Sequence, residues 1–232
     1  MLTSKMDNKM LNSKMDNKNT SLLENLFCLR QELDVYCLIT VNRESIIKKG
    51  AGKTFFAFLQ GACKKLIALS ICKIYEYEKA YELNSVEGVL KHIIDERLSA
   101  LDSSSVCGFI CKYENRPDED ELLSSLSSTV AGFKKKYENE LERFKTYRDK
   151  VVAHSEFGFN LDNIPSYDVM ECLFDFGADF YKLVSKDFIS NASASVVPFD
   201  LNSSRKVRTG LSRILSEHCL TDIKKEWNEE FT

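Results

Sequence analysis

The sequence predicts a nearly all-α protein, and three observations lead to this expectation. The 232 residues include only nine glycines and three prolines, too few for the many turns of an all-β fold. Apolar residues recur at helical spacing over most of the chain. Hydrophobic residues make up 44% of the sequence, which is enough for one full core, so one main domain is the simplest expectation.

The elements of the first half follow from this spacing. Residues 1–19 hold a polar near-duplication, Ser4–Lys9 and Ser13–Lys18, and are expected to form a flexible N-terminal tail. The bundle is expected over residues 20–190. Its first three helices are predicted from Ser21 to about Lys48, from Thr54 to Ala80 at the bundle centre, and from about Ser85 to Leu101 with Asn84 or Ser85 as N-cap.

The second half begins with residues 102–118, which are rich in serine and predict a connection with at most a short turn of structure. A long helix follows from Leu122 to Ala153, loosened at Gly132, after an acidic run that suits the positive end of the helix dipole. The helix from Ser166 to Ser190 carries an aromatic stripe typical of a core. Residues 191–232 are expected to be a linker and a last helix that packs on the bundle.

Charge and cysteine usage limit where the protein works. The formal net charge is −3, so no global field attracts nucleic acid, and any RNA contact depends on a local patch. Eight cysteines accompany a start that does not resemble a signal peptide, so we expect reduced, mostly buried thiols and a cytoplasmic location. No uncharged apolar run approaches the ~20 residues that cross a bilayer, so no membrane partner is expected.

Two familiar motifs are incomplete. Gly50–Thr54 ends like a phosphate-binding P-loop, but its first glycine is replaced by Ile47 and no strand precedes it, so Lys53 and Thr54 are expected to open a helix. Cys107 and Cys111 lack the paired spacing of a zinc site. We therefore expect neither a metal nor another cofactor.

The segment from Leu141 to Glu156 places Arg148, Asp149, Lys150 and His154 within two helical turns. On an ideal helix, Arg143, Tyr147, Lys150 and His154 fall within about 60° of one another, whereas Arg148 lies about 120° from His154. The long arginine side chain can bend part of that way, or a partner subunit can complete the site.

These groups suit RNA cleavage without a metal. Histidine can take the ribose 2′-OH proton or protonate the leaving 5′ oxygen, and an arginine fork can bind the scissile phosphate. The substrate supplies its own nucleophile, the 2′-OH. The alternative is that His154 interacts with the helix dipole and that Arg148, Asp149 and Lys150 form an ordinary solvated face.

The run Tyr147–Ser155 resembles the signature of HEPN domains, an arginine followed by a polar residue and then a histidine four to six residues later. Its Arg-Asp-Lys-x-x-Ala-His form is similar to the AbiU-type abortive-infection HEPN-like family of bacteria. The helix from Phe55 to Ile74 also looks like that family's first conserved block. The likeness covers roughly Leu22 to Phe188.

The resemblance implies an up-and-down helical bundle with an additional C-terminal helix, usually a homodimer with two motifs facing each other. It implies a metal-independent endoribonuclease acting as a toxin or in antiviral defence, with RNA as substrate and an antitoxin or defence-system protein as partner. Carried over, Arg148 would bind phosphate, His154 would be the acid or base, and Asp149 would orient them. Lys150, Tyr147 and Ser155 are then expected to contact the substrate.

Two points remain open in this interpretation. Glu156 stands where HEPN toxins paired with nucleotidyltransferases carry a modified tyrosine, so that form of control is not expected. The same bundle could also lack turnover and hold RNA or a protein through the run Lys134–Lys136 or a dimer groove, although such a run is usually a solvated helix face.

Overall fold

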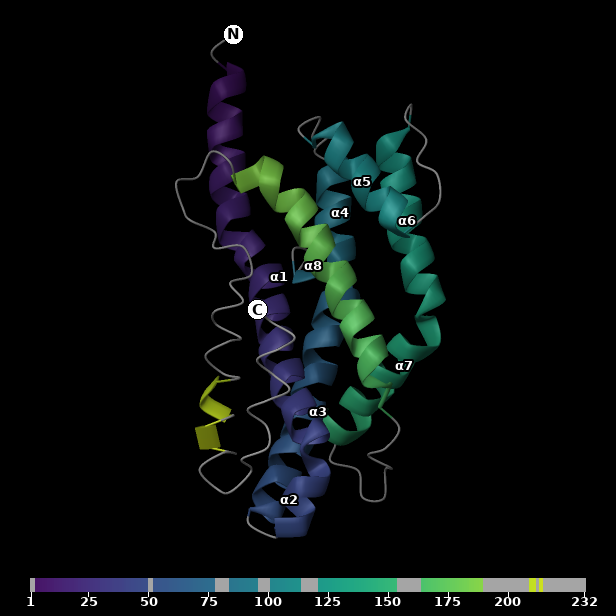
Figure 1. Ribbon diagram of the computed structural model, residues 1–232. Helices are drawn as coiled ribbons and strands as arrows, with labels where there is room; N and C mark the ends of the chain where they lie inside the picture. The colour runs from purple at the N-terminus through teal and green to yellow at the C-terminus, as the bar shows by residue number, and fades with distance from the viewer. Residues whose placement is uncertain are drawn as a thin grey trace.

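The computed structural model describes the backbone of residues 3–49, 52–77, 84–95, 101–113, 121–153, 164–189, 209–211 and 213–214. Every regular element in these ranges is a helix, which confirms the predicted all-α bundle. Helices far apart in sequence lie side by side in it, and α1 packs against both α3 and α8 (Figure 1).

The first predicted helix is two helices in the structure. α1 spans Thr3–Val41 and α2 spans Arg43–Lys49. They meet at Asn42, whose side-chain amide donates to the Leu38 carbonyl at 2.8 Å and competes with the backbone amide for the same acceptor. The segment expected as a tail has a helical backbone from Thr3 onward, since lysine, methionine and leucine are good helix formers.

α3 spans Lys53–Tyr75 and is the central helix of the bundle, where it packs against α1, α4, α7 and α8. Gly52 precedes it with φ 72°, a left-handed conformation that glycine adopts without strain. Lys53 and Thr54 therefore open a helix, as predicted. α3 alone among the described helices is long and apolar enough to pass for a membrane span, a test that the core helix of a soluble protein also passes.

α4 spans Val86–Asp95 and begins as predicted, because the Ser85 hydroxyl accepts a hydrogen bond from the Gly88 amide at 3.2 Å. The connection predicted over residues 102–118 is wrong in part. α5 spans Ser103–Tyr113, capped by Asp102, whose carboxylate accepts from the Ser105 amide at 2.9 Å. Because serines dominate this stretch, the helical spacing of its three apolar core residues was overlooked. These residues, Val106, Phe109 and Ile110, are buried.

The long helix predicted from Leu122 to Ala153 is divided in three. α6 spans Leu122–Lys136, α7 spans Glu138–Tyr147, and η2, a π-helical segment, spans Arg148–Ala153. The break falls at Tyr137, with φ −107° and ψ 20°, and not at Gly132. The Tyr137 ring lies against Phe133, with centroids 4.8 Å apart, and the Tyr137 backbone amide still donates to the Phe133 carbonyl at 3.2 Å.

α8 spans Tyr167–Ile189 and confirms the predicted aromatic core. The Phe176 ring stacks on Phe133 with centroids 3.7 Å apart, and Tyr113 meets Phe176 edge to face at 4.7 Å. Such aromatic pairs add to the stability that burial provides. This cluster joins α5, α6 and α8 close to the junction of α6 with α7.

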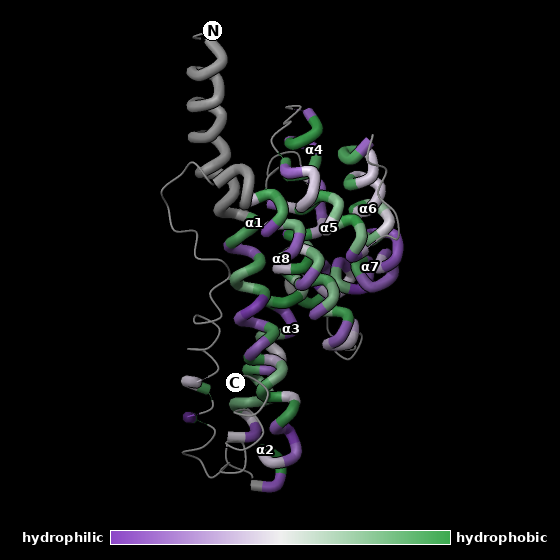
Figure 2. The backbone as a smooth tube through the Cα atoms, turned by 45° about the horizontal axis from the view of Figure 1, so that its top comes forward, coloured by the Kyte–Doolittle hydropathy of each residue, from purple (hydrophilic) through white to green (hydrophobic). Residues whose placement is uncertain are grey.

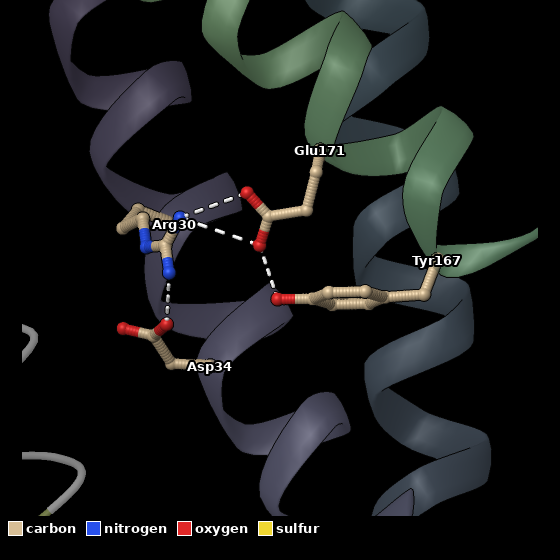
Figure 3. A network of polar contacts seen from close by, with 4 residues as sticks. All are labelled: Arg30, Asp34, Tyr167 and Glu171. Carbon is tan, nitrogen blue, oxygen red and sulfur yellow. Dashed lines mark hydrogen bonds and ion pairs between the residues drawn. The ribbon is translucent and has the colours of Figure 1, made fainter. Parts of the chain in front are cut away.

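A polar network ties α1 to the start of α8 (Figure 3). Arg30 donates to Asp34 at 2.6 Å and to Glu171 at 3.1 Å, and the Tyr167 hydroxyl donates to Glu171. The guanidinium carbon also lies 5.4 Å from the Phe174 ring centroid. Asp34 is almost fully buried, so removing Arg30 would take the ion pair away from a buried charge.

The cysteines are less buried than expected. All seven described cysteines are free thiols, and only Cys63 and Cys72 are buried. Cys28, Cys111 and Cys172 are exposed because each falls on the outward face of its helix, although each has an apolar residue next to it in the sequence. Cys219 lies outside the described residues.

Two predicted segments lie mostly outside the described part of the chain. Of the linker and last helix, 191–232, the structure describes residues 209–211 and 213–214, which are helical. Leu211 is buried and packs with Leu38, Ile39, Ile46 and Phe56. The acidic run before Leu122 is likewise undescribed except for Glu121, which precedes α6.

Glu32 makes the stability of this fold depend on pH. It lies on α1 with its Oε2 atom buried and without a hydrogen-bond partner. Burial raises the pKa of Glu32 to about 7, although Ser70 and Lys73 oppose the shift. Because the folded chain holds this proton more tightly than the unfolded chain, the free energy of unfolding falls as pH rises from 4.5 to about 7.

We therefore expect Glu32→Gln to stabilise the protein by roughly 2 kcal/mol at pH 8 and by little at pH 4.5. Urea unfolding at the two pH values measures this difference. Glu24→Gln, at an exposed position on the same helix, is the matched control and should leave the pH dependence unchanged. A Glu32→Gln variant with the wild-type pH dependence would contradict the assignment.

Candidate active site

The Arg148 segment is positioned by a change of helix geometry at the end of α7. η2 continues from α7 without a loop, and Phe144, Tyr147 and Val151 bury their side chains in the bundle core. The segment is therefore anchored from the inside. π-helical turns next to α-helices occur frequently at functional sites.

The wider turn corrects the geometry that the sequence suggested. The expected grouping of Arg143, Tyr147, Lys150 and His154 assumed 100° per residue through Ala153. From Arg148 onward the segment is π-helical, with hydrogen bonds between residues i and i+5. The angles calculated for an α-helix therefore apply only up to Tyr147.

The Arg148 guanidinium lies between two carboxylates. Its Nε atom donates to Asp149 Oδ1 at 2.8 Å, and its Nη1 atom donates to Glu76 Oε2. Glu76 follows the last residue of α3, where its backbone amide donates to the Cys72 carbonyl at 2.7 Å. The two ion pairs thus orient Arg148 against the end of α3.

The Arg148 side chain remains accessible, with 24% of its surface exposed. Burial lowers the pKa of Arg148, but the hydrogen bonds to Asp149 and Glu76 raise it by more, so the guanidinium stays cationic. Burial and the nearby Glu76 raise the pKa of Cys72 to about 12. Cys72 is therefore a neutral thiol near pH 7 and is not activated as a nucleophile.

A comparison with protein families assigns the chain to a family. The HEPN_AbiU2 family model, described as AbiU2, matches residues 16–208, which is most of the chain. The chain belongs to this AbiU2 family of HEPN domains. No curated protein and no solved structure matches the AbiU2 chain significantly. The matched range includes α3, η2 and His154, which carried the resemblance in the sequence.

The structure brings two of the predicted site residues of this AbiU2 chain together, Arg148 and Asp149. Lys150 is exposed in the same π-helical segment. His154 and Ser155 lie outside the described residues. The segment that carries them starts directly after η2 and ends before Ile164, whose carbonyl accepts a hydrogen bond from Arg143 at 3.3 Å.

Tyr147 is placed differently from the expectation. Predicted as a substrate contact, it is 1% exposed and belongs to the core. Burial raises the pKa of its hydroxyl, with a smaller contribution from Tyr36. Its position is explained by Phe144, three residues earlier, which is also fully buried and shows that this face of α7 turns inward.

Sequence reasoning missed Glu76 as a member of the site. It lies 72 residues before Arg148, in a stretch that was expected to continue the helix to Ala80. The sequence offered only a weak sign that Glu76 belongs to the site, namely one carboxylate at the end of the most apolar helix. Its Oε1 atom is buried without a hydrogen-bond partner.

Proposed function

We propose that this AbiU2-family protein is a metal-independent endoribonuclease that acts as a toxin or effector in bacterial antiviral or toxin–antitoxin defence. The observation that carries the proposal is the half-exposed Arg148 guanidinium, oriented by Glu76 and Asp149 in the π-helical segment just before His154. A preorganised cation of this kind can stabilise charge that develops on a phosphate.

In the proposed reaction the ribose 2′-oxygen attacks the adjacent phosphorus and the bond from phosphorus to the 5′ oxygen breaks. The products are a 2′,3′-cyclic phosphate and a free 5′-hydroxyl. His154 either accepts the 2′-OH proton or, as imidazolium, protonates the leaving 5′ oxygen. Arg148 binds the scissile phosphate through its fork, and Lys150 adds a positive charge beside it.

Asp149 is proposed to orient Arg148, because it holds the Nε edge at 2.8 Å. Tyr147, by contrast, supports the site from within the core. Ser155 remains a proposed substrate contact beside His154. A second copy of the chain is proposed to supply the other acid or base group, since one imidazole can serve only one of the two proton transfers at a time.

The proposal is tested with the purified protein, chelator and a labelled RNA, beside the same RNA carrying 2′-deoxy sugars. We expect cleavage of the all-ribose strand in chelator, with cyclic phosphate and 5′-hydroxyl ends, and no cleavage of the deoxy positions. Cleavage that chelator abolishes, or equal cleavage of the deoxy strand, would contradict the mechanism.

A second candidate function is a binding module without turnover, which holds RNA or a protein partner. One observation favours it: two guanidinium nitrogens of Arg148 are already engaged by Glu76 and Asp149, as in a structural ion pair. It would be supported by RNA binding at low salt without any cleavage, because phosphate contacts are strongest there.

A further inference from the structure

A cavity of about 660 Å³ lies between the end of α3 and the junction of α6 with α7. This volume falls in the usual range of small-molecule sites, about 300–1,000 Å³. Its apolar side is formed by Ile71, Cys72, Tyr75 and Leu141. Its charged lining balances three lysines, Lys134, Lys135 and Lys145, against three carboxylates, Glu76, Glu138 and Glu142. Most of the charged lining comes from α6 and α7, of which α7 is mostly hydrophilic (Figure 2).

The cavity adjoins the Arg148 site through one residue. Glu76 lines the cavity and also accepts the hydrogen bond from Arg148 Nη1. On α7, Leu141 and Lys145 line the cavity at a spacing of four, which places them on one side of the helix, and η2 begins with Arg148 three residues after Lys145. A chain that occupied the cavity would continue toward Arg148.

The lysines of the cavity differ in how far they are engaged. Lys134 is paired with Glu87 at 2.5 Å, and Lys145 is only loosely paired with Glu142 at 3.7 Å. Lys135 is exposed and forms no ion pair with any described residue. Lys135 and Lys145 are therefore the cations that can bind an incoming anion without breaking a close ion pair.

From these observations we propose that the cavity binds one nucleotide of the RNA strand next to the scissile phosphate. The base lies against the apolar side, and Lys135 and Lys145 bind its phosphate. The match to a nucleotide, which joins a flat apolar base to an anionic phosphate, rests on the apolar wall and on Lys135 and Lys145, the two lining lysines without a close ion pair. The inference rests on the proposed function, because it takes Arg148 as the position of the scissile phosphate.

The test measures the affinity of the whole protein for a short fluorescent 2′-O-methyl oligoribonucleotide, which cannot be cleaved because its nucleophile is blocked. Lys135→Ala and Lys145→Ala are each expected to weaken binding about tenfold, the effect of losing one charged hydrogen bond. Each should also lower the salt dependence of binding by about 0.7 in the log–log slope.

Lys136→Ala is the matched control, since Lys136 is the exposed neighbour that does not line the cavity. It should bind within about twofold of wild type near 0.15 M salt, where exposed charges more than ~8 Å apart are screened. The same affinity loss in all three variants would overturn the proposal, because it would indicate a diffuse field.

A second arm separates a nucleotide of an RNA chain from a free nucleotide. Adenosine monophosphate should compete only weakly with the oligonucleotide, because it lacks the contacts beyond the cavity. Full competition at equal affinity would overturn the RNA form of the proposal.

Binding to an uncleavable strand separates this inference from the nuclease proposal. Cleavage that does not depend on Lys135 or Lys145 overturns the cavity site alone. Lys135-dependent binding without cleavage of ordinary RNA supports the cavity and overturns the nuclease.

Discussion

Replacing His154 by alanine is expected to lower the rate constant of RNA cleavage by about 10²–10⁴, the usual contribution of a general acid or base. The physical reason is that proton transfer to or from a ribose oxygen would then rely on water. Single-turnover cleavage of a labelled RNA, with chelator present, measures the effect. RNA affinity should change little, because the variant keeps Arg148 and the lysines.

The control for this prediction is His92→Ala, which removes another imidazole from α4 and leaves η2 unaltered. It should cleave at the wild-type rate. If His154→Ala cleaves as fast as wild type, the role given to His154 is wrong. If both variants lose activity and unfold at a lower temperature, the loss reflects lower stability. A His154→Gln variant must then separate a catalytic effect from a stability effect.

Replacing Arg148 by alanine is expected to lower the rate constant by about 10²–10³, the cost of removing one preorganised donor to a developing oxyanion. Arg148→Lys should recover only part of the loss, because the ammonium keeps the charge and loses the fork that can bind two phosphate oxygens. The two variants also separate the roles of charge and geometry.

The Arg148 prediction is measured with the same single-turnover assay, alongside thermal unfolding. The pair with Glu76 is half-exposed, so its loss should affect stability modestly. Wild-type cleavage by Arg148→Ala would contradict a catalytic role. Full recovery by Arg148→Lys would contradict the bidentate grip on phosphate while leaving a role for the charge.

Hydropathy periodicity predicted most of the bundle, because each helix needs one apolar face toward the shared core. It predicted α3, α4 and α8 to within a few residues at the ends that the structure describes. α5 was missed because three serines and a glycine dominated the composition around only three core residues. The break at Tyr137 was missed because no helix breaker marks it: it is a local change of the Tyr137 dihedral angles.

Some residues of the candidate site could likewise be predicted from the sequence, and others could not. Arg148, Asp149 and His154 could be found because they are close in sequence. Glu76 could not, because the turn of the chain that brings it to Arg148 depends on how α3 and α7 pack. The π-helical segment also escaped prediction, since no single residue of Arg148–Ala153 excludes an α-helix. The burial of Tyr147 follows from the same packing.

The central claim is that the Arg148 guanidinium and the His154 imidazole act on one phosphodiester. A crystal structure of the protein with a bound 2′-O-methyl oligoribonucleotide tests it most directly. The account predicts that both side chains, from one chain or from two facing copies, form hydrogen bonds to the groups of a single phosphodiester link. Arg148 still paired with Glu76 and His154 directed away from the bound strand would contradict it.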